Sequence, residues 1–187
     1  MNTMKKSINL AGLLILTSLF ITVSDCNAQS LKMTAKDLTK ESTAVLYGKC
    51  SKIKSQWNEN KSIIYTYITI IPEEYIKGNL GPEAVIAVPG GRVDDIVYEV
   101  SEMPVFTEGE EIVAFIWTNP AGKNLVTGGS QGKMKIDKDP KTGERMVHGF
   151  VPEVKVDAEK KGAEHSGKTE NVLLEDFVSE LKGYLKN

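Results

Sequence analysis

The residue types that carry catalysis or bind metals are few in this chain and lie far apart. His148 falls in a predicted strand and His165 in a charged segment, and neither stands at metal-ligand spacing from another histidine or cysteine. No nucleophile elbow, phosphate-binding loop or dinucleotide fingerprint occurs. We therefore expect no metal and no cofactor. An enzyme or enzyme inhibitor would need a site assembled from distant residues, such as Arg92, Glu108 and His148.

Residues 137–144 superficially resemble a calcium-binding loop. The glycine falls one place late, Pro140 interrupts the loop, and Lys141 occupies a position that needs an oxygen ligand. A hairpin turn that links a strand at 134–136 to one at 146–148 accounts for the same residues. The sequence favours the hairpin.

The most distinctive loop is Pro89–Asp95. Gly90 and Gly91 allow the backbone to turn sharply or to approach another group closely. Arg92 is followed by two aspartates, so it either recognises a charged ligand or forms a local surface ion pair that contributes little. These three residues are candidate ligand-binding residues.

Three aromatic residues form a second candidate for ligand contact. Trp57, Tyr65 and Tyr67 would present an aromatic face of the kind that often anchors a partner at an interface. The alternative is that they cover the outer surface of the fold beneath the C-terminal helix.

The N-terminus predicts export. Two lysines, at 5 and 6, precede an apolar run over 8–23, and Cys26-Asn27-Ala28 precedes Gln29, which is the order of a secretory signal peptide. The run is shorter than the roughly 20 residues of a membrane-spanning helix, so we expect cleavage after Ala28 and no transmembrane anchor in the mature protein. In the alternative, Cys26 is the lipidated residue of a lipoprotein box, although Asp25 stands where such boxes have a small residue.

The remaining chain has the composition of an acidic, single-domain protein. The full sequence has 23 Lys and Arg against 25 Asp and Glu, and residues 1–28 contain two lysines and one aspartate, so the mature net charge is −3. Without a basic cluster we expect no nucleic-acid partner. Cys50 is then the single cysteine, which excludes an internal disulfide, and its neighbours favour a buried strand position over a reactive site.

The elements that must position these residues are mostly strands. Thr34 followed by Asp37 predicts a capped helical segment within 29–43. About seven short strands with Gly- and Pro-rich turns and no βαβ alternation predict an all-β domain over 44–156, either a barrel or a sandwich. Their expected ranges are 44–50, 63–75 with a bulge or bend at Ile71-Pro72, 84–88, 96–100, 112–117, 125–136 and 145–151.

Two segments complete the chain. Residues 157–168 are charged and lack apolar periodicity, which is typical of a linker. Residues 169–187 predict an amphipathic helix, capped by Thr169, with large apolar residues at helical spacing. Its apolar stripe either packs on the barrel or binds a partner.

The strand at 112–117 is apolar on both faces, as expected for a central strand covered on both sides.

Three segments, Ser42–Lys49, Tyr65–Ile70 and Glu74–Gly78, resemble the opening of netrin-type modules, which belong to the oligonucleotide/oligosaccharide-binding (OB) barrel class. Further segments resemble those of secreted bacterial β-barrel proteins; they are 89–91, 103–106, 109–111 and 129–133. The resemblance implies a small OB-like, netrin-module-like, closed or partly open barrel and does not fix the ligand. Tissue inhibitors of metalloproteases, relatives of this class, use a free N-terminal cysteine. This chain would begin at Gln29, so no functional residue is carried over.

These observations predict an exported, non-enzymatic β-barrel module that binds a protein or a small glycan-like ligand. We expect a periplasmic or secreted location and, as partner, another envelope or secreted protein. The alternatives are an envelope-associated enzyme or enzyme inhibitor, and a surface lipoprotein that acts as an assembly subunit through Cys26.

Overall fold

The structure of the protein, a computed structural model, describes residues 32–150 and 170–186. These residues belong to one compact unit, Lys32–Asn187. The expected signal peptide, its cut between Ala28 and Gln29, the Cys26 alternative, the linker 157–168 and the expected cap Thr169 lie outside the described residues.

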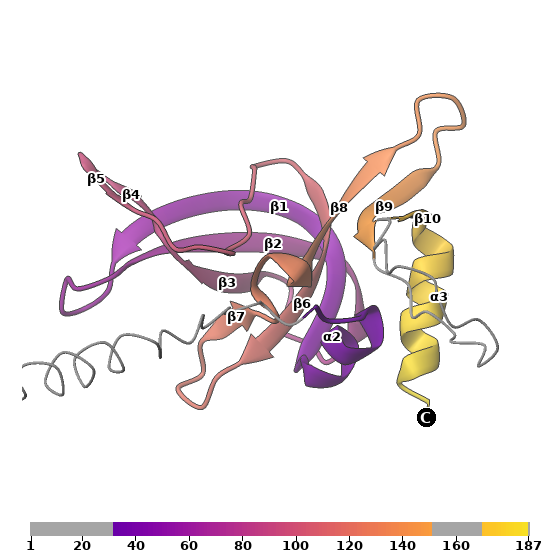
Figure 1. The fold of residues 1–187 in the computed structure, drawn as a ribbon, viewed down its shortest axis with the longest axis horizontal. Coiled ribbons are helices and arrows are strands. Elements are labelled where there is room, and N and C mark those ends of the chain that lie inside the picture. Colours follow the sequence, from indigo (N-terminus) through magenta and orange to yellow (C-terminus); the bar gives the residue numbers. More distant parts are fainter. Residues whose placement is uncertain (1–31, 151–169, 187) are drawn as a thin grey trace, which may run out of the picture. The chain divides into compact units, whose positions relative to one another are not determined.

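Five strands close into a barrel, so the fold is mainly β, as predicted (Figure 1). Around the barrel they are β1 (Ala44–Trp57), β2 (Ile64–Lys77), β3 (Ala84–Pro89), β7 (Asn124–Val126) and β6 (Glu111–Thr118), and β6 pairs back onto β1. Every neighbouring pair is antiparallel except β3 and β7. A closed five-stranded barrel is compatible with an OB-like fold.

The first two strands are long because β-branched and aromatic residues fit a pleated surface at almost every position. Ile68 and Ile70 point into the barrel and are fully buried, whereas Tyr65 and Tyr67 alternate to the outside. The register slips where Tyr47 opposes Glu74 but the next residue, Gly48, opposes Pro72. The predicted bulge next to Pro72 is therefore confirmed.

Strand β6 separates two apolar cores, as its two-sided apolar sequence predicted. Ile112, Ala114 and Ile116 face the barrel interior, which we call the inner core. Val113 and Phe115 face the opposite side, where helices cover the sheet, and belong to the outer core. Because β6 contributes side chains to both cores, its backbone lies between the barrel interior and the layer of helices.

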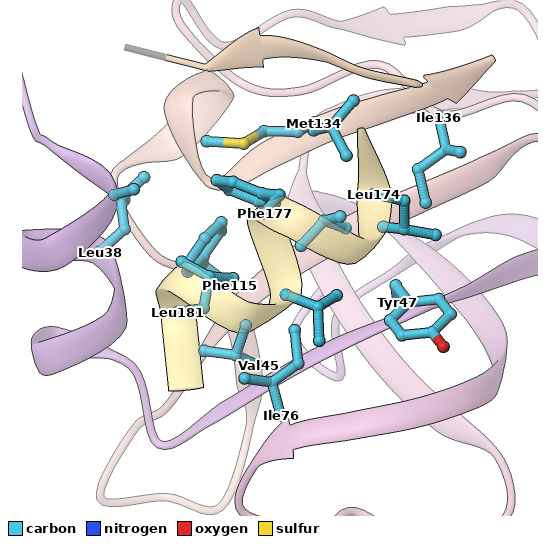
Figure 2. Close-up of a cluster of buried hydrophobic side chains, with 14 residues drawn as sticks. Leu38, Val45, Tyr47, Ile76, Phe115, Met134, Ile136, Leu174, Phe177 and Leu181 are labelled. Atoms are coloured by element: carbon cyan, nitrogen blue, oxygen red, sulfur yellow. The ribbon is translucent and has the colours of Figure 1, made fainter. Parts of the chain in front are cut away.

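Two helices cover the outer core. Helix α2 (Ala35–Glu41) begins at the predicted capping box, in which the Thr34 hydroxyl accepts from the Asp37 backbone N–H and the Asp37 carboxylate accepts from the Thr34 backbone N–H. Helix α3 (Leu174–Tyr184) buries one apolar face against strands β1, β6 and β8 (Figure 2). Its stripe therefore packs on the barrel.

The C-terminal element starts differently from the prediction. Glu170–Leu173 forms strand β10, which pairs with β9 (Arg145–Phe150), and the helix begins only at Leu174 with Leu173 as its N-cap. The apolar residues Val172 and Leu173 are compatible with a strand as well as with a helix. The neighbouring edge of β9 supplies the hydrogen-bond partners that decide between them.

The predicted segment 125–136 also divides. It contains β7, a 3₁₀ turn η1 (Gly129–Gly132) and the start of β8 (Lys133–Lys138), because Gly128 and Gly129 both adopt positive φ and break the strand. Strands β8 and β9 form an antiparallel hairpin over residues 133–150, as predicted. A second small sheet consists of β4 (Gly91–Val93) and β5 (Ile96–Tyr98).

In the described ranges, no helix has the length and apolar character that crossing a membrane requires.

Candidate functional site

A cavity of about 570 Å³ opens where the inner core reaches the surface. One wall comes from the inward faces of β1, β2 and β3, and the opposite wall from the segment 98–106. Met103 and Phe106 of this segment also pack against the inner core. The cavity is thus an exposed continuation of the barrel interior. Its lining residues are Ile53, Ser55, Thr66, Ile68, Val88, Pro89, Gly90, Gly91, Tyr98, Glu99, Val100, Ser101, Met103, Pro104, Val105 and Phe106.

Gly90 and Gly91 line this cavity, and their backbone requires glycine. Both have positive φ, 111° and 133°. A Cβ on Gly91 would lie 2.3 Å from Thr66 Oγ1 and 2.5 Å from Ser55 Oγ. The Thr66 hydroxyl donates to the Gly90 carbonyl oxygen at 2.7 Å. The glycines therefore let β4 cross closely over the inner face of β1 and β2, which shapes one end of the cavity.

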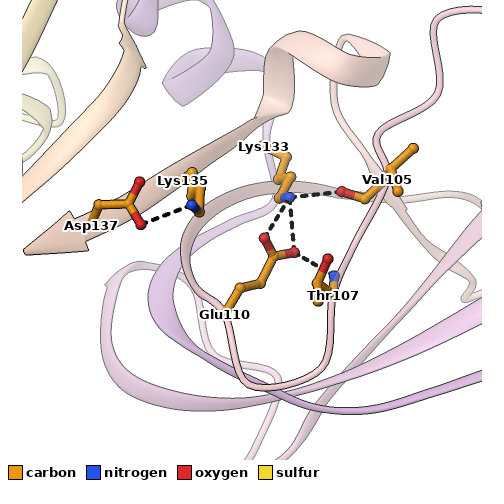
Figure 3. A network of polar contacts seen from close by, with 6 residues as sticks. All are labelled: Val105, Thr107, Glu110, Lys133, Lys135 and Asp137. Atoms are coloured by element: carbon orange, nitrogen blue, oxygen red, sulfur yellow. Dashed lines mark hydrogen bonds and ion pairs between the residues drawn. The ribbon is translucent and has the colours of Figure 1, made fainter.

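A partly buried ion pair holds the opposite wall in place (Figure 3). The Lys133 ammonium donates to the Val105 carbonyl oxygen at 2.7 Å and lies 2.8 Å from a carboxylate oxygen of Glu110. The same carboxylate accepts from the Thr107 backbone N–H. The side chains of Lys133 and Glu110 are only 13% and 9% exposed. Strand β8 thereby fixes the segment that lines the cavity.

Apolar side chains continue from the cavity onto the surface. Val105 is 81% exposed, and Ile96, Val97 and Tyr98 of β5 are each more than a third exposed. Val97 alternates with Ile96 and Tyr98 and therefore points to the other face of the hairpin. We call Ile96, Tyr98 and Val105 the apolar rim. Tyr98 and Val105 also line the cavity. A concave apolar surface that extends into an exposed apolar rim is typical of a binding site.

The aromatic residues Tyr65 and Tyr67 lie on the other side of the same sheet. Their ring centroids are 6.3 Å apart, and the Lys123 ammonium lies 3.9 Å from the centre of the Tyr65 ring. Across the barrel, Tyr67 opposes Ala87, Ala87 opposes Leu125, and Leu125 opposes Trp117. We call Tyr65, Tyr67, Leu125 and Trp117 the outer strip.

Trp57 does not share a face with the two tyrosines. It opposes Ile64 and follows Ser55 by two residues, so its register position is on the cavity side of the sheet. The C-terminal helix covers none of the three aromatics: among the described residues, its cluster includes Val45, Ile76 and Phe115 instead. The interpretation that placed them under that helix is therefore wrong.

The Gly90–Gly91 pair and the two tyrosines are thus separated by the thickness of one sheet, and Trp57 lies on the side of the glycines. Neither Trp117 nor Lys123 was predicted from the sequence as a contact residue. The position of Trp117 in the strand, alternating with Ile112, Ala114 and Ile116, is the signal that could have placed it outside the barrel.

The remaining predicted candidates are not brought together. Arg92 is exposed on β4, opposite Val97, and does not line the cavity. A Glu108 carboxylate oxygen accepts from the Ile53 backbone N–H at 2.9 Å. His148 lies on β9, with its Nε2 3.7 Å from an Asp137 carboxylate oxygen. Figure 1 shows β4 and β9 on opposite sides of the barrel.

Cys50 is fully buried in β1 within the inner core, as predicted. Burial, followed by the nearby Glu110 and Glu108 carboxylates, raises the pKa of its thiol. A thiol with a raised pKa forms little thiolate and is a poor nucleophile at neutral pH. The segment 137–144 is a hairpin turn, in which an Asp139 carboxylate oxygen accepts from the backbone N–H groups of Lys141 and Thr142. Within 32–150 and 170–186, no group of three or more His, Cys, Asp or Glu side chains is arranged to hold a metal ion.

A comparison of the chain with models of protein families and with curated proteins finds no match.

Proposed function

We propose that this protein is an exported, non-enzymatic binding module that receives a partner protein at the cavity and the apolar rim. The observation that carries the proposal is the continuity between a largely apolar cavity of about 570 Å³ and three exposed apolar side chains beside it, those of Ile96, Tyr98 and Val105. A small ligand that filled the cavity would leave much of this rim in water. A protein surface would cover both, which favours a macromolecular partner.

The build of the cavity also supports binding. One wall is set by the close crossing of Gly91 over Ser55 and Thr66, and the other is held by the Lys133–Glu110 pair. Walls that are fixed before the partner arrives lower the entropy cost of association. The Ser55 and Thr66 hydroxyls lie 2.9 Å apart and hydrogen-bond each other, so neither has the basic partner that a nucleophile requires.

The location and class of the module are part of the same proposal. The basic and apolar N-terminus favours export to the periplasm or beyond, with Gln29 as the first mature residue. The closed five-stranded barrel is compatible with the netrin-type resemblance of residues 42–78. Mass spectrometry of the exported protein tests the first point. A chain that begins with a lipid-modified Cys26 would contradict it.

Site-specific photo-cross-linking tests the partner site. A photoreactive amino acid replaces Tyr98 in the cavity wall and, as a control, Trp117 on the outer strip, in the full chain expressed in its own cells. We expect one stoichiometric cross-linked companion from position 98 and none from position 117. The double variant Ile96→Ser/Val105→Ser should abolish the adduct. The control Ile71→Ser/Val85→Ser, which removes two exposed apolar side chains elsewhere, should retain it. Equal cross-linking from both positions, or none from position 98, contradicts the proposal.

The outer strip supports a second candidate function, the binding of a small glycan-like ligand. Trp117 is 43% exposed and shares a row with Leu125, Ala87 and Tyr67 across β6, β7, β3 and β2. Strands 2 and 3 of OB barrels are the surface that binds oligosaccharides and oligonucleotides in that class. Calorimetric titration with envelope-derived oligosaccharides should give a heat of binding with wild type and none with Trp117→Phe/Tyr67→Ala. A response that persists in this variant contradicts the second function.

A further inference from the structure

The charge of the cavity rim identifies the kind of partner segment that fits. We infer that the cavity takes a segment of a partner polypeptide that carries lysine or arginine beside apolar residues. This inference rests on the proposed function, because it specifies the partner of the same cavity.

The cavity lining is suited to a side chain with an apolar stem and a cationic head. Of the sixteen lining residues, only Glu99 carries a charge. Ile53, Ile68 and Met103 contribute apolar surface to the walls. Lysine and arginine bury their methylene stems along such surfaces while the charged head remains at the edge, near a carboxylate.

The segment that carries the apolar rim contains acidic residues and no basic residue. Between Val93 and Gly122 the sequence has seven Asp and Glu residues and no Lys, Arg or His. Three of these carboxylates have partners within the fold: Glu108 accepts from a backbone N–H, Glu110 pairs with Lys133 and Glu111 lies near Arg145.

The other four carboxylates belong to Asp94, Asp95, Glu99 and Glu102, which are exposed. Their side chains form no hydrogen bond or ion pair with the described residues. Asp94 and Asp95 are in the β4–β5 turn, and Glu99 and Glu102 are in the segment that continues from β5 along the cavity. These unpaired charges flank an apolar surface, which favours a partner of opposite charge.

The cations on β4 and on the β1 segment that lines the cavity do not neutralise these carboxylates. Arg92 opposes Val97 on the hairpin and forms no ion pair with the described residues. Lys52 and Lys54 alternate with Ile53 and therefore point away from the cavity face.

The same charges argue against two other occupants. A second copy of this chain would bring two sets of these unpaired carboxylates together, which is unfavourable. A small organic cation could contact Glu99 but would leave Ile96 and Val105 exposed. A polypeptide with basic and apolar residues satisfies both the charge and the exposed apolar area.

Fluorescence anisotropy with labelled synthetic peptides tests the inference on the full chain. One peptide alternates valine and lysine, and its twin has glutamate in place of each lysine. We expect binding of the lysine peptide only, with an affinity that falls as salt is raised. The double variant Glu99→Lys/Glu102→Lys should weaken this binding by at least about tenfold. The matched control Glu83→Lys/Glu144→Lys changes the net charge equally, away from the cavity, and should stay within about twofold of wild type.

The outcomes separate this inference from the proposed function. Equal binding of both peptides, or equal loss in the two charge variants, overturns the inference. Absence of peptide binding in a protein that still cross-links a companion through position 98 overturns the inference alone, whereas absence of both overturns the proposed function as well. Binding of dodecyltrimethylammonium but not of the lysine peptide would assign the site to a small amphiphile and also overturn it.

Discussion

Single side chains hold the cavity wall in its position. Lys133 reaches from β8 to the Val105 carbonyl oxygen and to the Glu110 carboxylate, and both ionic side chains are almost excluded from water. Two residues further along β8, Lys135 forms a similar contact with Asp137, at 2.8 Å, but in a solvent-exposed setting. The two pairs, drawn together in Figure 3, differ mainly in burial.

Replacing Lys133 therefore has a much larger effect than replacing Lys135. In Lys133→Met the Glu110 carboxylate, only 9% exposed in wild type, loses its cation, and we expect a loss of about 2 kcal/mol or more in the free energy of unfolding. Lys135→Met should leave the free energy of unfolding unchanged within error, because solvent screens the exposed pair. Urea denaturation of both variants measures the difference. Losses of equal size would show that the Lys133 pair is as weak as a surface pair.

At the scale of elements, the bend of β1 against β2 depends on one close backbone approach. A Cβ on Gly48 would lie 2.3 Å from the Ile71 carbonyl oxygen and 2.8 Å from the Pro72 Cα. Both neighbours are backbone atoms, so neither can rotate away. The register slip at Gly48 lies at this contact, which lets two long strands bend enough to meet β6 and β3 and close the barrel.

Gly48→Ala should therefore destabilise the protein by at least about 2 kcal/mol, since the strands must separate to admit a methyl group. Gly183 provides the control. It lies in α3, where a Cβ would meet no atom of the described residues within 4 Å beyond its own helical turn, so Gly183→Ala should stabilise the protein by about 0.5–1 kcal/mol through helix propensity. Thermal unfolding of both variants shows whether each substitution raises or lowers the stability. If Gly48→Ala leaves the stability unchanged, β1 and β2 can separate at this contact with little cost in free energy, which contradicts the prediction.

Strand β9 is tied to the barrel by a two-pronged ion pair. The Arg145 guanidinium donates to both carboxylate oxygens of Glu73 on β2, at 2.7 and 2.9 Å. The hydrogen bonds from Arg145 hold the pKa of Glu73 below its usual value of 4.5. A carboxylate with a lowered folded-state pKa stabilises the fold above its unfolded pKa. That contribution is lost as the pH falls through the folded-state value.

Glu73→Gln should consequently lower the free energy of unfolding by less than about 1 kcal/mol at neutral pH, because solvent screens a side chain that is half exposed. The difference from wild type should shrink as the pH falls below 4.5. Glu144→Gln, next to Arg145 in sequence but without a side-chain partner in the described residues, should show no such dependence. Urea titrations at several pH values measure both. If the difference in the free energy of unfolding between Glu73→Gln and wild type grows as the pH falls, the lowered pKa of Glu73 is contradicted.

At the scale of the whole described unit, the two cores are coupled through shared strands. Strands β1 and β6 contribute Leu46 and Ile116 to the inner core and Val45 and Phe115 to the outer core. Unfolding either core exposes one face of the same strands. We therefore expect the barrel and helix α3 to unfold together.

Two large-to-small substitutions test this coupling. Phe177→Ala removes the fully buried ring of α3 from the outer core, and Ile68→Ala removes a fully buried side chain from the inner core. Each should cost about 2–5 kcal/mol, and each should keep one transition that coincides in far-ultraviolet circular dichroism and in tryptophan fluorescence. In Phe177→Ala, loss of helical signal before the fluorescence change would show that α3 unfolds independently of the barrel.

The sequence alone determined those features that depend on neighbouring residues. The Thr34–Asp37 capping box, the alternation of β2, the two-sided burial of β6 and the hairpin turn at Asp139 all involve residues within a few positions of one another. Local hydrogen bonds and the period of the apolar residues fix such features, so the mainly β fold class could be predicted. The β10 strand could not, because it forms only against the edge of β9.

The tertiary structure decided which candidate residues share a surface. Gly90 and Gly91 line the cavity, while Tyr65 and Tyr67 lie on the opposite face, and Arg92 is outside both. The Lys133–Glu110 pair, which holds the cavity wall, joins residues 23 positions apart. The reason is physical: the register between distant strands sets which side chains meet, and a shift of one residue would move each of them to the other face of the sheet.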